Sequence, residues 1–164
     1  RDGTWQQQSR EAYDRGHGAV VLLYNRRKQT VVLTRQFRMP VYLHDGCGML
    51  IEAAAGLLDS ASPEARIIAE AEEETGFRIT QIEPVFRAFM SPGSVTEKLW
   101  FFIAEYQDED RVSRGGGVEE EGEDIEVLEW PLEHALQAVA SGEIMDAKTI
   151  MLLQYLALNR TLGE

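Results

Sequence analysis

The sequence is poor in cysteine and in long apolar runs, and each shortage excludes a class of protein. Cys47 is the only cysteine, so no internal disulfide can form, and no cysteine or histidine pair has zinc-like spacing. No run approaches the roughly 18 apolar residues that a membrane span requires. No signal peptide is visible. We therefore expect a cytoplasmic protein that does not enter a membrane.

Basic residues are also scarce. The chain has 16 Lys and Arg against 28 Asp and Glu, a formal net charge of -12. Beyond residues 26–28 there is no basic cluster, which argues against binding a long polyanion, and we expect no nucleic acid partner. A small phosphorylated molecule remains compatible, because a bound divalent metal can locally reverse the sign of the field.

Length and composition indicate one domain over residues 1–164, of which 44% are hydrophobic, and the mixture of predicted strands and helices makes it an α/β domain. The chain begins with Arg1 rather than methionine, so we expect that an N-terminal piece is missing. Strands are predicted at 18–24, 30–37, 49–56, 79–90, 97–106 and 125–130, the first two as a hairpin, and helices at 63–75, 131–141 and 146–159. Pro84 indicates an edge strand or a bulge.

The predicted helix at 63–75 carries an unusual concentration of negative charge. Ser62 is a good N-cap, Pro63 suits the first turn and Gly76 supplies a stop. Glu70 and Glu74 lie one turn apart, a spacing at which like charges cost roughly 0.2–0.5 kcal/mol per pair. One interpretation is a solvated acidic face. The other is a bound cation that relieves the repulsion.

Carboxylate clusters are hard oxygen donors, which suit magnesium, manganese or calcium rather than zinc. Mg2+ is the first choice, with Mn2+ as the alternative. Because Mg2+ seldom sits in an all-protein cage, the missing ligands are expected to be phosphate oxygens of a substrate.

The segment at 55–77, AGLLDSASPEARIIAEAEEETGF, resembles a Nudix box, G-x5-E-x7-R-E-U-x-E-E-x-G-U, where U is a bulky apolar residue. Gly56 matches the first glycine and residues 70–77 match the end, although the interval is one residue short. Ser62 stands in place of the first glutamate and Ala69 in place of the arginine. We interpret the two as a paired replacement, because losing both partners together leaves no uncompensated charge. A weakened or lost activity is the alternative.

The resemblance extends along nearly the whole chain. The blocks YDRGHGAVVLLYN, VVLTRQFR, MSPGSVTE, GGGVEEEGEDIEV and GEIMDAKTIMLLQYL are similar to the GDP-mannose pyrophosphatase branch of the Nudix hydrolases, close to the ADP-ribose pyrophosphatases. It implies a Nudix fold, in which a mixed β-sheet is sandwiched between α-helices. It also implies Mg2+-dependent hydrolysis of a nucleotide sugar, most simply GDP-mannose to GMP and mannose 1-phosphate. Two alternatives stay open: an ADP-ribose pyrophosphatase, and a nucleotide-binding Nudix module without catalysis.

The same resemblance implies which residues form the site. Metal is expected on Glu70, Glu74, Glu123 and the backbone carbonyl of Ala55. Glu121 is the expected base that activates water. Glu73 is a second candidate for a catalytic role, with a solvent-facing carboxylate as the alternative. The glycines at 115–117 would let this loop close over the substrate.

Substrate contacts are also implied by the resemblance. Arg38 is expected to meet the substrate, since a guanidinium suits bidentate phosphate binding, and Arg35 of the same strand should point to the other face. Glu97 and Lys148 match further contact positions. Tyr13 and Arg15 match an N-terminal arm that reaches the substrate across a homodimer.

Overall fold

The computed structural model describes residues 2–118, 120 and 122–159, and within them seven strands form one sheet. The strands are β1 (Gly18–Asn25), β2 (Thr30–Phe37), β3 (Met49–Glu52), β4 (Ala54–Leu57), β5 (Glu83–Phe89), β6 (Lys98–Glu105) and β7 (Glu126–Pro131). The helices are α1 (Met39–Asp45), α2 (Pro63–Thr75), α3 (Leu132–Ser141) and α4 (Ala147–Asn159), with a 3-10 turn at Asp108–Asp110. The main path of the sheet runs β3-β2-β1-β6-β5, while β4 pairs with β1 and β7 with β2.

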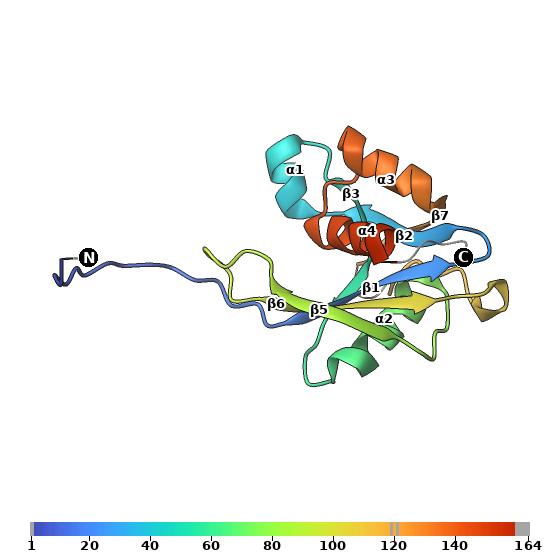
Figure 1. The fold of residues 1–164 in the computed structure, drawn as a ribbon, viewed down its shortest axis with the longest axis horizontal. Helices are drawn as coiled ribbons and strands as arrows, with labels where there is room; N and C mark the ends of the chain where they lie inside the picture. The colour runs from blue at the N-terminus through green and yellow to red at the C-terminus, as the bar shows by residue number, and fades with distance from the viewer. Residues whose placement is uncertain (1, 119, 121, 160–164) are drawn as a thin grey trace.

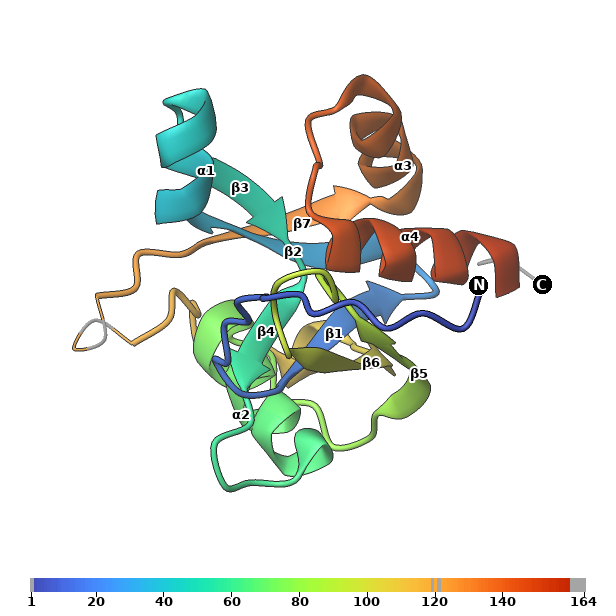
Figure 2. The same cartoon turned by 90° about the vertical axis from the view of Figure 1, so that its left-hand side faces the viewer.

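Strand β1 lies at the centre of the sheet, and all eight of its residues are buried. It pairs antiparallel with β2 and parallel with β6, which makes the sheet mixed. Its side chains alternate between two core clusters: Val20 and Leu22 pack with residues of α3 and α4, while Val21 and Leu23 pack with residues of α2. Figures 1 and 2 show α2 on one side of the sheet and α3 and α4 on the other. The predicted sandwich is confirmed.

Helix α2 has the predicted bounds and the predicted caps. The Ser62 hydroxyl accepts a hydrogen bond from the Ala65 N–H at 3.2 Å, and the Gly76 N–H donates to the Glu72 carbonyl at 3.0 Å. The face that packs on the sheet includes Ile67 and Ala71. The buried residues of this helix also include Glu70 and Glu74, so the acidic run is not simply a solvated face.

Three local features differ from the expectations. The single strand predicted at 49–56 is two strands, because the chain leaves the edge of β2 at Glu52 and joins β1 after Ala53. The sequence did not predict helix α1, because its residues form no apolar stripe. In the structure none of them is buried. Arg38 lies just beyond the end of β2 and caps α1, so the strand alternation that contrasted it with Arg35 does not apply. The register shift at Pro84 confirms the predicted bulge.

The N-terminal arm, residues 2–17, is exposed along its whole length and extends away from the sheet (Figure 1). It is held near its end, where the Tyr13 N–H donates to the Ser94 carbonyl at 2.7 Å and the Tyr13 carbonyl accepts from the Thr96 N–H at 3.1 Å. None of the helices within the described residues has the length and apolar character needed to cross a membrane.

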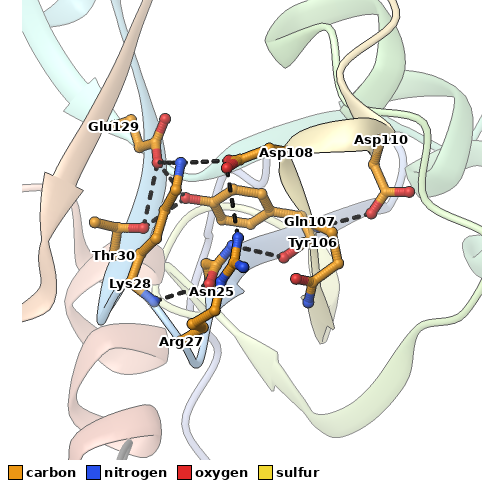
Figure 3. A network of polar contacts seen from close by, with 9 residues as sticks. All are labelled: Asn25, Arg27, Lys28, Thr30, Tyr106, Gln107, Asp108, Asp110 and Glu129. Carbon is orange, nitrogen blue, oxygen red and sulfur yellow. Dashed lines mark hydrogen bonds and ion pairs between the residues drawn. The ribbon is translucent and has the colours of Figure 1, made fainter.

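A polar network closes the end of the β1–β2 hairpin (Figure 3). Asn25 is fully buried; its amide donates to the Tyr106 carbonyl at 3.0 Å and accepts from the Lys28 N–H at 2.9 Å. The Tyr106 hydroxyl donates to Glu129 at 2.9 Å and lies 2.6 Å from the Thr30 hydroxyl. Burial raises the pKa of Tyr106, which keeps this donor protonated. The network therefore ties the hairpin turn to β7 and to the segment after β6.

Replacing Asn25 with alanine is expected to lower the free energy of unfolding by about 2 kcal/mol, because the buried Tyr106 carbonyl and the partly buried Lys28 N–H lose their partners. Urea denaturation at neutral pH measures this change. Lys28→Ala is the matched control and should lower the free energy of unfolding much less, because the ion pairs of Lys28 are exposed to solvent. Equal losses in the two variants would contradict the assignment.

Candidate active site

A pocket of about 650 Å³ opens at the beginning of β1, at the opposite end of that strand from the Asn25 network. Its walls come from β1, β4, α2, the junction of β2 with α1, the start of α4 and the segment before β7. It brings together seven of the predicted site residues: Arg15, Arg38, Ala55, Glu70, Glu97, Glu123 and Lys148. Residues from distant parts of the chain therefore meet in one cavity.

Three of the other predicted site residues do not line the pocket, and the fourth is not described by the structure. Glu74 is 2% exposed and does not itself line the pocket, but it accepts a hydrogen bond from Ala55, which is one of the lining residues. Glu73 is exposed and is not a lining residue. Tyr13 is 68% exposed on the arm, also away from the lining. Glu121 lies outside the described residues, and the roles of all four stay predictions.

Negative charge is concentrated where α2 packs on β4. One Glu74 carboxylate oxygen accepts a hydrogen bond from the Ala55 N–H at 3.2 Å, while Glu70 pairs with Arg66 at 2.5 Å. Burial and the negative charge of Glu70 raise the pKa of Glu74 to about 8, with a smaller contribution in the same direction from Glu123. A bound cation would favour the ionised form of this carboxyl group.

The glycine at the start of the box has a steric reason. A Cβ atom at Gly56 would lie 1.9 Å from the Glu70 carboxylate oxygen. Gly56 itself is fixed opposite Ala19 in the β1–β4 ladder, so the strand cannot move away easily. Only a residue without a side chain lets Glu70 lie against β4 in this way.

The donor set fits a hard divalent cation. Glu70, Glu74 and Glu123 offer carboxylate oxygens, and Ala55 offers a backbone carbonyl. Among the residues that the structure describes, no three acidic, histidine or cysteine side chains converge closely enough to hold a metal alone. Electrostatic interactions act over longer distances than metal coordination. Side chains too far apart to hold a metal alone can therefore still raise the pKa of Glu74. A cation here would need further ligands from water or from substrate phosphates, as Mg2+ usually does.

The lining of the pocket also includes cationic side chains, each of which is paired with a carboxylate. The Arg38 Nε donates to Glu52 at 2.6 Å, and the Lys148 ammonium donates to the other oxygen of Glu52 at 2.5 Å. Arg15 forms an ion pair with Glu97 at 3.5 Å. Arg35, in contrast, pairs with the exposed Glu126. The lining of the pocket therefore combines acidic and cationic side chains, as the binding of an anion together with a divalent cation requires.

Glu52 was missed by the sequence analysis, although one signal was present. It is a single glutamate inside the apolar stretch MLIEAAAG, and it is 2% exposed. A charged residue in the middle of a predicted buried strand indicates a paired or functional position.

The glycines at 115–117 are packed against the end of α2. The Gly116 N–H donates to the Glu74 carbonyl at 2.9 Å, and the Gly117 N–H donates to the Glu73 carbonyl at 3.1 Å. A Cβ atom at Gly117 would lie 2.4 Å from the Glu123 carboxylate. In this conformation the glycines allow a close approach that holds Glu123 beside α2, and the expected closure of the loop stays a prediction.

Without metal, the free energy of unfolding is expected to fall as the pH rises from about 5 to 8. The pKa of Glu74 is about 8 in the folded protein, against an ordinary value of 4.5. Between these values the folded chain keeps a proton that the unfolded chain releases, so a higher pH favours unfolding, by on the order of a few kcal/mol in total. Urea denaturation in EDTA measures this slope. Glu74→Gln should flatten it, and a wild-type stability that rises over this range would count against the assignment.

Three similar proteins carry the same description, GDP-mannose pyrophosphatase. The protein from Klebsiella pneumoniae subsp. pneumoniae is 58% identical over 158 residues, which cover 94% of this chain and 78% of the relative. That from Salmonella arizonae is 52% identical over 164 residues, covering 99% and 85%. That from Yersinia pestis (strain Pestoides F) is 56% identical over 155 residues, covering 94% and 77%.

No family model matches the chain. A comparison with solved structures concerns the fold. A solved structure described as an ADP compounds hydrolase superposes with a TM-score of 0.69, covering 87% of this chain and 71% of that one. Its sequence identity is 17%, so it supports the predicted architecture alone.

Proposed function

We propose, on the premise that the chain belongs to the GDP-mannose pyrophosphatase family, that its pocket hydrolyses the pyrophosphate bond of a nucleotide sugar. The enzyme is a Nudix pyrophosphatase whose preferred substrate is GDP-mannose, giving GMP and mannose 1-phosphate. The observation that carries this proposal is the pocket itself, which is lined both by Glu70 of α2 and by the cations Arg38 and Lys148. A diphosphate needs both.

The residues divide the work between binding and proton transfer. Glu70, Glu74, Glu123 and the Ala55 carbonyl hold the divalent cation, for which we propose Mg2+ and, as the alternative, Mn2+. Once bound, such a cation neutralises charge on a diphosphate and makes attacking water more acidic. Arg38 and Lys148 bind and orient the anionic substrate.

A carboxylate accepts the proton of the water that attacks phosphorus, and the bond from phosphorus to the bridging oxygen breaks. Glu121 is the proposed base, with Glu73 as the second candidate. Arg15, Glu97 and Tyr13 are proposed to contact the nucleotide or the sugar. Arg15 and Glu97 line the pocket, which supports their part of the proposal.

The two departures from the Nudix box leave the local structure intact. Ser62 caps α2, and no buried side-chain polar atom among the described residues lacks a hydrogen-bond partner. This supports the paired replacement of Ser62 and Ala69, and with it an active enzyme rather than a module that binds nucleotide without cutting it.

Relative kcat/KM values for GDP-mannose and ADP-ribose, measured with Mg2+, test the preferred substrate. We expect GDP-mannose to be the better of the two. A higher value for ADP-ribose would reassign the sugar and the base while leaving the pyrophosphatase activity in place. Binding of either substrate without turnover would favour the non-catalytic module.

The exposed N-terminal arm supports a homodimer. Trp5 is 98% exposed, and a second apolar group lies around α1. It consists of Phe37, Met39, Tyr42, Leu43 and Met49. Surfaces of this kind usually mark interfaces. We propose that the arm contacts a second copy; the cytoplasmic location and the absence of nucleic acid binding stay predictions.

Sedimentation velocity tests the dimer. The wild type should sediment at twice the chain mass of 18.5 kDa, and Trp5→Ala should shift the protein toward the monomer. Leu158→Ala, at a residue that is 85% exposed on α4, is the matched control and should leave the dimer unchanged. A monomeric wild type would rule out the dimer.

A further inference from the structure

Glu52 connects the two cations of the pocket wall. Arg38 comes from the junction of β2 and α1, whereas Lys148 lies in the first turn of α4, so the two arrive from separate elements. Each oxygen of the Glu52 carboxylate accepts from one of them, at 2.6 Å and 2.5 Å. The Glu52 side chain is 3% exposed, against 39% for Arg38 and 14% for Lys148. Glu52 is therefore the least accessible member of the group.

The surrounding contacts fix this arrangement. Ala53, next to Glu52, donates its N–H to the Thr149 hydroxyl at 2.7 Å. Asp146 accepts from the Thr149 N–H at 3.0 Å and from the Lys148 ammonium at 2.8 Å. Glu52 and Ala53, at the end of β3, thus bond to Lys148 and Thr149, at the start of α4. Side chains supported in this way are restricted in their rotamers.

The donors that remain set the direction of binding. A guanidinium has five N–H donors, and the Nε donor of Arg38 is the one that Glu52 occupies. Within the described residues both Nη groups are left for a bidentate contact with phosphate. An ammonium has three donors, and among the described residues Glu52 and Asp146 take two of those of Lys148, which leaves one.

We propose that Glu52 is a positioning residue, whose carboxylate holds Arg38 and Lys148 side by side so that their remaining donors bind the phosphate groups of the substrate. Glu52 cannot bind the anion itself, because its charge has the wrong sign and it is buried. The two cations would repel each other without it. This inference rests on the proposed function, since it requires an anionic substrate in this pocket.

The kinetics of Glu52→Gln with GDP-mannose and Mg2+ test the proposal. Glutamine keeps the shape but not the charge, so the cations lose their orientation and KM should rise about tenfold while kcat changes less than about threefold. A merely structural role would reduce the amount of active enzyme, which lowers kcat and leaves KM unchanged. Glu126→Gln, which breaks the exposed pair with Arg35, is the matched control and should change neither.

A second background shows whether Glu52 acts through the cations. In the variant Arg38→Met/Lys148→Met, adding Glu52→Gln should leave KM unchanged, since nothing remains to be positioned. A further rise in KM there would overturn the proposal. If Glu52→Gln alone does not fold, Glu52→Gln/Lys148→Met is compared with Lys148→Met, because it leaves fewer unpaired charges. The double variant should have the higher KM, and equal values would overturn the proposal.

Failure of the inference and failure of the proposed function give different results. A wild type that hydrolyses no nucleotide sugar defeats both. A wild type that turns over GDP-mannose, together with an unchanged KM in Glu52→Gln, defeats the role of Glu52 alone.

Discussion

Glu74→Gln is expected to lower kcat for GDP-mannose by about 1000-fold or more, which corresponds to a loss of about 4 kcal/mol of transition-state stabilisation. Glutamine has the size of glutamate but no charge, so its amide oxygen would be a much weaker ligand in the proposed metal site. The fold should survive, because the substitution removes a buried charge close to Glu70. The melting temperature of the metal-free variant at about pH 8 should therefore equal or exceed that of the wild type.

The matched control for this substitution is Glu72→Gln on the same helix. Glu72 is partly exposed and pairs with Arg78 at 2.9 Å, away from the residues that line the pocket. We expect a change in kcat of less than about twofold, since a surface ion pair contributes little. Activity in Glu74→Gln comparable to that of Glu72→Gln would show that Glu74 does not support catalysis.

Gly56→Ala is expected to lower kcat/KM by about 100-fold, because the added Cβ would lie 1.9 Å from the Glu70 oxygen and would displace that carboxylate. The loss should appear largely as weaker activation by Mg2+, so that a higher Mg2+ concentration is needed to reach half of the maximal rate. A Mg2+ titration of the initial rate measures both effects. The cause is steric, since Gly56 has no positive φ angle.

Gly93→Ala is the matched control for Gly56→Ala. A Cβ atom at Gly93 meets no heavy atom within 4 Å, and the residue also has no positive φ angle. The control should keep the wild-type rate and the wild-type response to Mg2+. If Gly56→Ala behaves in the same way, the close contact between β4 and Glu70 has no role in catalysis.

The parts of the fold that the sequence predicted are those with local signals. Helix α2 is delimited by Ser62 and Gly76, whose capping chemistry can be recognised without knowing the rest of the structure. The hairpin of β1 and β2 follows from two apolar runs around a polar turn. The placement of Glu70 and Glu74 one turn apart likewise needs only the helical repeat.

Most of the features that the sequence did not predict depend on contacts between residues that are far apart in the chain. Glu52 and Lys148 are 96 positions apart, and nothing in either neighbourhood indicates that they meet. The break at Ala53 arises because the chain changes its partner strand there, which is a property of the sheet as a whole. Helix α1 buries none of its residues, so it lacks the periodic pattern by which helices are recognised.

The most direct measurement is the release of GMP from GDP-mannose by the wild-type protein, followed by mass spectrometry with Mg2+ and with excess EDTA. The proposed function predicts GMP and mannose 1-phosphate in equal amounts with Mg2+, and no products above the uncatalysed background with EDTA. Turnover that is unaffected by EDTA, or products other than this pair, would contradict a metal-dependent pyrophosphatase built on Glu70 and Glu74.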